Sequence, residues 1–142
     1  MSNIITIPNI ENYNQRIVDG SLILTPTIAD IGLCNEDLRG SYINECIIDG
    51  VIINIKKYTP LLLNIYETME KESIIQNTIL NNTEEKNHLK GFKYYEKIGL
   101  SIQGADSRRM IKEIINMIKI QKKTIKLNIC LKTDKIIFIE IK

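Results

Sequence analysis

The spacing of apolar residues changes once near the C-terminus, and the change separates a predicted helix from predicted strands. Between residues 107 and 121 apolar side chains recur every three or four positions, as on one face of an α-helix. After Lys123 they alternate with polar residues, and a second β-branched run follows the polar residues 133–135. The pattern predicts a helix over 107–121, followed by a hairpin of strands 125–131 and 136–141.

The predicted helix has an apolar arc and a basic arc on a helical wheel. The apolar arc comprises Met110, Ile111, Ile114, Met117 and Ile118. The basic arc comprises Arg108, Lys112, Lys119, Lys122 and Lys123, with Glu113 and Asn116 beside it. We expect Asp106 or Ser107 to cap the helix, and the apolar arc to pack on the apolar face of the hairpin.

Two Asp-Gly pairs predict hairpins in the first part of the chain. Asp19-Gly20 separates the β-prone runs 13–18 and 21–25, and Asp49-Gly50 separates the runs 41–48 and 51–57. Asp-Gly is typical of the type I′ turn, because both central residues of that turn need a positive φ. A short strand is also predicted at 4–7, where Pro8 ends it.

A pentapeptide-repeat coil is the alternative for residues 36–55. Apolar residues recur at every fifth position from Val18 to Ile53, and four five-residue blocks from Glu36 to Ile55 resemble pentapeptide repeats. Glu36 and Val51 depart from the small residue that such repeats carry at the first position of a block. Four blocks would form one turn of a coil, whereas a solenoid buries its core by stacking several turns, so we favour the hairpin.

The middle of the chain predicts a second helix and more strands. Thr59 is placed as the N-cap and Pro60 as the first residue of a helix that extends to about residue 81. A helical turn over 84–90 and one or two strands over 92–103, interrupted by Gly99, follow. The prediction is a single α+β domain of residues 1–142, with a hairpin-rich N-terminal half, two main helices and a C-terminal helix packed on a β-hairpin.

Composition places the chain among ordinary globular proteins. Apolar residues make up 44% and charged residues 25% of the 142 positions. We expect a cytoplasmic protein without a membrane span or signal peptide, because no apolar run approaches 18 residues and the N-terminal segment is not basic and then apolar. Cys34, Cys46 and Cys130 lack CxxC spacing and are expected to be buried, reduced thiols.

No group of residues predicts a catalytic site, a metal site or a cofactor. His88 is the only histidine and lies in a polar segment. The Glu140-Ile141-Lys142 triplet has the E-x-K form of metal-dependent nucleases, but Asp134, the acid before it, falls in the predicted turn of the same hairpin. Residues 104–107 could hold an anion at a helix start, although helix capping explains them equally well. We therefore expect a protein that is not an enzyme.

The charges are distributed unequally along the chain. Residues 1–50 hold seven acidic and two basic side chains, whereas the remainder holds 17 basic and 10 acidic ones. The two halves could attract each other within one fold, or they could form surfaces with different partners. On the second interpretation, the candidate partner-binding residues are Asp30, Glu36, Asp37, Glu45 and Asp49.

The chain resembles the immunity proteins of bacterial contact-dependent and other polymorphic toxins in its size, its heavy use of Ile, Asn and Lys, and its lack of catalytic residues. The resemblance implies an inhibitor that binds a cognate protein toxin, and the acidic residues would face a basic cleft of that toxin. The alternative is an accessory protein that binds nucleic acid through the basic arc of the helix 107–123. That arc lacks the aromatic residues that stack on bases, so nucleic acid is the less favoured partner.

Overall fold

A six-stranded sheet forms the larger layer of the computed structural model, which describes residues 14–18, 21–25, 36–86 and 90–141. Its strands, in spatial order, are β1 (Asn14–Val18), β2 (Ser21–Thr25), β9 (Ile136–Ile141), β8 (Ile125–Cys130), β3 (Tyr42–Ile48) and β4 (Val51–Ile52). Every neighbouring pair is antiparallel except β2 and β9, which run parallel. The N-terminal hairpin β1–β2 is therefore joined to the sheet by the last strand of the chain.

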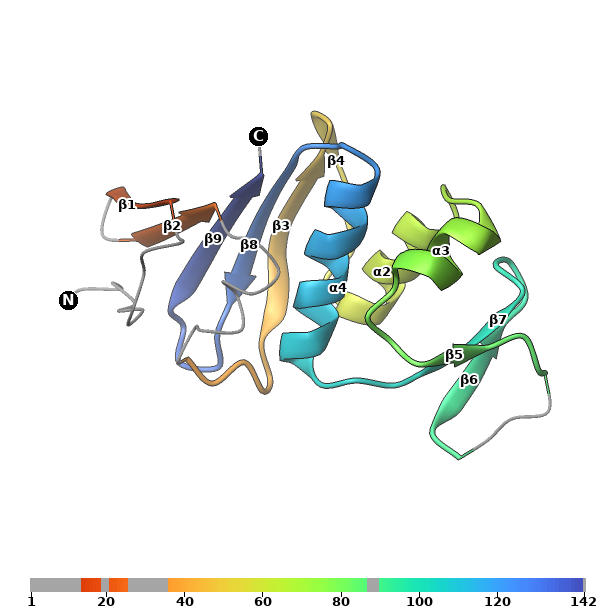
Figure 1. Ribbon diagram of the computed structural model, residues 1–142. Coiled ribbons are helices and arrows are strands. Elements are labelled where there is room, and N and C mark those ends of the chain that lie inside the picture. Colours follow the sequence, from red (N-terminus) through yellow and green to blue (C-terminus); the bar gives the residue numbers. More distant parts are fainter. Residues whose placement is uncertain (1–13, 19–20, 26–35, 87–89, 142) are drawn as a thin grey trace.

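Three helices and a small sheet form the rest of the described structure. The helices are α2 (Tyr58–Tyr66), α3 (Lys71–Asn77) and α4 (Ser107–Ile120). The small sheet has the order β5 (Asn82–Thr83), β7 (Leu100–Gln103) and β6 (Phe92–Tyr95), and it is antiparallel throughout. Figure 1 shows α4 between the large sheet on one side and α2 and α3 on the other. The α+β prediction is confirmed.

The core lies on both sides of α4. Ile111, Ile114 and Ile118 of this helix are fully buried in one cluster with apolar residues of β8 and β9. The same cluster includes α2 side chains such as Leu61 and Ile65. The predicted contact between the apolar arc and the C-terminal hairpin is confirmed, as is the N-cap, because Asp106 Oδ1 accepts from Arg109 N at 2.8 Å.

The hairpin prediction for residues 41–57 is confirmed in part, and the pentapeptide coil is not what the chain forms. Asp49 and Gly50 have φ values of 49° and 79°, as the predicted turn requires. The return strand β4 has only two residues, although the chain continues beside β3 through bonds from Ile53 N to Cys46 O and from Ile43 N to Lys56 O. Strands β1 and β2 pair as predicted, whereas Asp19-Gly20 and the predicted strand 4–7 lie outside the described residues.

The prediction of one helix over 59–81 is wrong, since the chain forms α2 and α3 instead. Lys57 is the N-cap of α2 without a side-chain hydrogen bond, so Thr59 does not cap it and Pro60 falls inside the first turn. The break follows Tyr66, where Thr68 Oγ1 donates to Ile65 O at 2.6 Å and offers that carbonyl a partner outside the helical ladder. The predicted helical turn over 84–90 is also wrong for residues 84–86, which are not helical, and residues 87–89 are not described.

Candidate partner-binding surface

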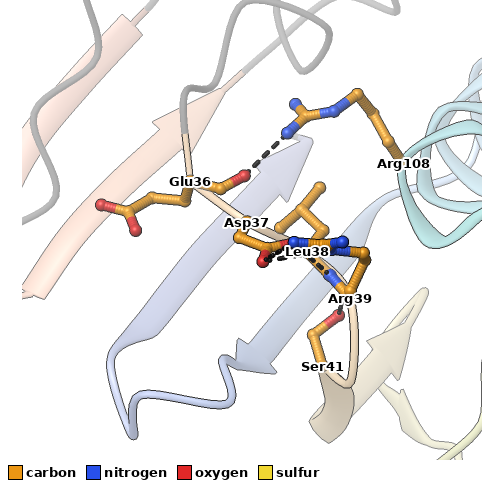
Figure 2. Close-up of polar contacts among 6 residues, drawn as sticks. All are labelled: Glu36, Asp37, Leu38, Arg39, Ser41 and Arg108. Atoms are coloured by element: carbon orange, nitrogen blue, oxygen red, sulfur yellow. Dashed lines mark hydrogen bonds and ion pairs between the residues drawn. The ribbon is translucent and has the colours of Figure 1, made fainter.

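Glu36 and Asp37 lie in the loop before β3, where basic residues already engage them. Arg108 Nη2 donates to Glu36 O at 2.7 Å, and Arg39 donates to both carboxylate oxygens of Asp37, as Figure 2 shows. The Arg39 side chain thereby holds the pKa of Asp37 down at about 2. Lys135 Nζ lies 3.5 Å from Glu36 Oε1. This end of β3 is consequently not an uncompensated acidic patch.

Glu45 and Asp49 lie elsewhere on the large sheet. Glu45 is exposed within β3, and Asp49 is exposed in the turn after it. Asp49 Oδ1 accepts from Thr124 N at 2.7 Å, which ties the turn to the start of β8. At about 3.3 Å per residue, β3 separates Asp49 from the Glu36–Asp37 loop by roughly 20 Å. Since Asp30 lies outside the described residues, the structure does not bring the five predicted acids into one patch.

The outer face of the large sheet, opposite α4, carries Glu45 in a mixed polar and apolar surface. Strand register places two rows of residues across β3, β8 and β9. The rows are Glu45–Asn128–Phe138 and Ile47–Lys126–Glu140. Two open grooves run here, one of about 470 Å³ that Ile47, Lys126 and Glu140 help to line, and one of about 130 Å³ between Glu45 and Phe138. No described helix covers this face.

The basic residues predicted along 107–123 do not form one open face, and Lys122 and Lys123 lie beyond the end of α4. Arg108, Lys112, Lys119 and Lys123 are partly buried, and only Lys122 of the predicted set is exposed. The expectation that Glu113 and Asn116 lie beside an exposed arc is wrong, because these side chains are 0% and 7% exposed. The helical-wheel prediction assumed that the helix is buried on one side only. In the structure α4 is buried on two sides, against the large sheet and against α2.

Glu113 is the centre of a buried polar cluster that the sequence did not reveal. Its carboxylate accepts from the hydroxyls of Tyr66 and Thr78, from Asn116 Nδ2 at 3.1 Å and from Ile79 N at 3.3 Å. Asn116 Nδ2 also donates to Asn77 O at 2.7 Å. Burial, and then the negative Glu113, raise the pKa of Tyr66 far above its usual range. Spacing gives no sign of this cluster, because its members come from three separate segments of the sequence.

The hydrogen bonds of Glu113 link separate elements of the fold. Both carboxylate oxygens of Glu113 are occupied by donors from the protein itself. The neighbouring cavity that Tyr66 helps to line has about 30 Å³, enough for about one water molecule. The carboxylate therefore ties α4 to α2 and to the chain after α3, and it leaves no room for a substrate.

The described residues contain no group of three His, Cys, Asp or Glu side chains able to hold a metal ion. Cys46 and Cys130 are buried free thiols, as predicted, and burial raises the pKa of Cys46 to about 11. Cys34, His88 and Lys142 lie outside the described residues. Asp134 lies in the β8–β9 turn and Glu140 near the far end of β9, so the structure separates the two acids of the E-x-K hypothesis by most of a strand.

Searches of family models, curated proteins and solved structures return no match for this chain. The helices within the described residues are all too short or too polar to cross a membrane. The candidate site is therefore identified from the chain's own geometry. On the outer face of the large sheet, acidic, basic and apolar side chains lie side by side.

Proposed function

We propose that this protein is an immunity protein that neutralises a cognate bacterial toxin by binding it through the outer face of the large sheet. The observation that carries the proposal is the pair of residue rows on that face, in which Glu45 and Glu140 lie among Ile47, Phe138 and Lys126. Protein interfaces commonly combine apolar contact with charged groups at the margin, and complementary charge speeds association.

The shape of this face suits a macromolecule better than a small substrate. Small-molecule sites are concave and enclose most of the ligand. The two grooves are open to solvent and lie along a sheet surface. An open surface of this kind can block an active site by covering it, and this is the inhibition that the resemblance to immunity proteins implies.

Isolation of the tagged protein from its native host at high salt tests the proposal. We expect one stoichiometric protein partner that halts growth when it is expressed alone and is tolerated when this chain is co-expressed. A partner that is harmless when expressed alone would refute the immunity function.

A charge reversal tests the surface separately. Glu45→Lys should weaken binding of the isolated partner more than about tenfold, because it puts a positive charge against the basic groups expected on the toxin. Glu96→Lys is the matched control, since Glu96 is exposed in the β6–β7 turn, away from the large sheet. Equal affinity of the two variants would show that the partner binds elsewhere.

The nucleic-acid alternative gains no support from the placement of the basic residues. Arg108 is engaged with Glu36 O, and Lys112 and Lys119 are partly buried. Binding through phosphates would weaken steeply with added salt, so titration of the protein with duplex DNA and with RNA at two salt concentrations checks this alternative directly.

A further inference from the structure

Three residues of different chemistry lie in one row on the outer face of the large sheet. Glu45 of β3 opposes Asn128 of β8, which in turn opposes Phe138 of β9. Opposed residues of antiparallel strands project to the same face, so a carboxylate, an amide and an aromatic ring lie side by side. The groove between Glu45 and Phe138 has about 130 Å³, the volume of about four water molecules. A groove of this size suits a single side chain.

The Glu45 carboxylate gives this groove its net charge. It makes no hydrogen bond or ion pair with another residue that the structure describes. In the neighbouring row Lys126 opposes Glu140, so the charges of these two residues offset each other. Lys56 Nζ, from the segment beside β3, donates to Asn44 O at 2.7 Å. The groove is therefore negative, and a cation is the occupant that complements it.

The spacing across the sheet suits a planar cation above Asn128. Neighbouring strands are about 4.8 Å apart, so Glu45 and Phe138 lie roughly 10 Å apart with Asn128 midway between them. A cation at the midpoint is within reach of both, because a carboxylate hydrogen bond spans about 3 Å and a cation–π contact extends to about 6 Å. The Asn128 amide oxygen offers a further acceptor.

A guanidinium group uses this combination better than an ammonium group does. Its N–H groups form a planar fork that matches a carboxylate, and its flat faces stack on aromatic rings. The lysine ammonium is a compact charge that holds its hydration shell more strongly. The row therefore favours arginine over lysine.

We propose that the groove formed by Glu45, Asn128 and Phe138 is a subsite for one arginine side chain of the partner protein. The guanidinium donates to the Glu45 carboxylate and to the Asn128 amide oxygen, and it stacks over the Phe138 ring. This inference rests on the proposed function for the identity of the partner, and it adds the chemical group by which that partner is recognised.

A titration with N-acetyl-arginine amide tests the subsite without the toxin. Backbone amide shifts of the isotope-labelled chain are followed by NMR at constant ionic strength, with N-acetyl-lysine amide as the control cation. We expect saturable shifts at Glu45, Asn128 and Phe138. The dissociation constant should be on the order of 10 mM, since an exposed ion pair and a cation–π contact are each weak. The lysine derivative should bind at least about threefold more weakly.

Two variants separate the contributions of the charge and the ring. Glu45→Gln removes the charge at nearly constant size and should weaken arginine binding about threefold or more. Phe138→Leu removes the ring and should reduce the affinity for the arginine derivative to that for the lysine derivative. Glu96→Gln is the matched control, since Glu96 is exposed in the β6–β7 turn, and it should leave binding unchanged. The NMR spectrum of each variant shows whether it is folded.

The isolated partner provides a second test within the complex. Each arginine of the partner is replaced by lysine, and binding is measured to the wild-type chain and to Phe138→Leu. We expect one arginine whose replacement weakens binding to the wild-type chain more than about threefold but has little further effect on Phe138→Leu. Non-additivity of this kind identifies side chains in contact.

The subsite would be refuted by an absence of saturable shifts, by equal binding of the two derivatives, or by arginine binding that Glu45→Gln and Phe138→Leu leave unchanged. A toxin that is neutralised although none of its arginines is coupled to Phe138 would also refute the subsite, while the immunity function would stand. Conversely, specific arginine binding by a chain that neutralises no toxin would support the subsite and refute the immunity function.

Discussion

Glu113 shows how a single buried residue can connect distant parts of this chain. Its carboxylate receives bonds from Tyr66 of α2, from Thr78 and Ile79 after α3, and from Asn116 of its own helix. A buried carboxylate is stable only when such donors replace the water it has lost. The donors depend on the acid in turn, because Tyr66 and Asn116 are themselves buried.

Replacement of Glu113 by alanine should therefore destabilise the fold by roughly 2–5 kcal/mol, since it leaves several buried donors without an acceptor. Urea unfolding followed by circular dichroism measures the change. Glu96→Ala, at an exposed position, should stay within about 0.5 kcal/mol of the wild type. A small effect of Glu113→Ala would mean that water enters the site and satisfies the donors.

The raised pKa of the Cys46 thiol leads us to expect a loss of stability at alkaline pH. Burial raises its pKa from 9.0 to about 11, so between these values the thiol ionises in the unfolded chain and stays neutral in the folded one. The contribution of this thiol to the free energy of unfolding should be constant below pH 9 and should fall as the pH rises from 9 to about 11.

Cys46→Ala isolates the thiol's share of this decline. In that variant the decline should begin nearer pH 10, where tyrosines of the unfolded chain ionise while buried Tyr66, with its raised pKa, does not. Urea titrations at several pH values provide the measurement, and the slopes are compared because the alanine also lowers stability at neutral pH. Identical slopes for both chains would contradict the role of Cys46.

These two residues also show the limit of residue-level inference from sequence. Burial of the thiol was predicted from the usual preference of free cysteine for the interior. Burial of Glu113 was missed, because a helical wheel reports which residues share a side but not how many sides are covered. Only the position of α2 against α4 makes the second side an interior one.

At the level of elements, the β3–β4 turn has the clearest local cause. Gly50 has φ of 79°, where an L-residue is strained, and no atom lies within 4 Å of the place where a Cβ would stand. Any loss of stability on substitution therefore comes from the backbone conformation itself and not from a steric clash.

Gly50→Ala should thus lower the free energy of unfolding by about 1 kcal/mol. Gly104→Ala is the matched control, because Gly104 has no positive φ and its Cβ would meet Gly91 O at an ordinary 3.9 Å. That substitution should be neutral or slightly stabilising. Thermal unfolding of both variants gives the comparison, and an equal loss in both would rule out the conformational explanation.

Elements with local signals were predicted well, and those set by distant contacts were not. Asp49-Gly50 and the change of period after Lys123 specified the β3–β4 turn and the C-terminal hairpin. The break between α2 and α3 was missed, because residues 67–70 contain no glycine or proline, and Thr68 is engaged by the distant Gln121, whose Nε2 donates to Thr68 Oγ1 at 2.9 Å. Strand order also lay beyond local patterns, since β2 pairs with β9 from the opposite end of the sequence.

At the scale of the whole molecule, α4 connects two layers. One layer is the large sheet, and the other comprises α2, α3 and the small sheet. The buried residues of α4, Ile114 and Ile118 among them, belong to one core cluster with residues of β8 and β9, with residues of α2 and with Leu100 of β7. A disturbance at the centre of this helix should therefore affect both layers and not one alone.

Ile114→Lys should unfold both layers together, at a cost of several kcal/mol for a buried and unpaired charge. Amide hydrogen exchange is the measurement. Protection should be lost both in β8, of the large sheet, and in β7, of the small sheet. Lys112→Ala, at a partly buried position of the same helix, should preserve protection in both. Loss in one sheet alone would show that the layers are independent.

The candidate partner-binding surface also depends on how strands that are distant in sequence are arranged. Sequence charge singled out Glu45, but strand register was needed to place it beside Asn128 and Phe138. Glu36 and Asp37 lie before β3 and Asp49 lies after it. The extended strand between them keeps these acids far apart, although they are close in sequence.

The parallel pairing of β2 with β9 determines the order in which the large sheet can be completed during translation. Hairpin β1–β2 is synthesised before the other described elements, yet Leu22 pairs with Ile137, which is synthesised more than a hundred residues later. Until then the hairpin has a free edge while β3 and the helices emerge beside it. The contact between β2 and β9 therefore forms only after all the described strands and helices have been synthesised.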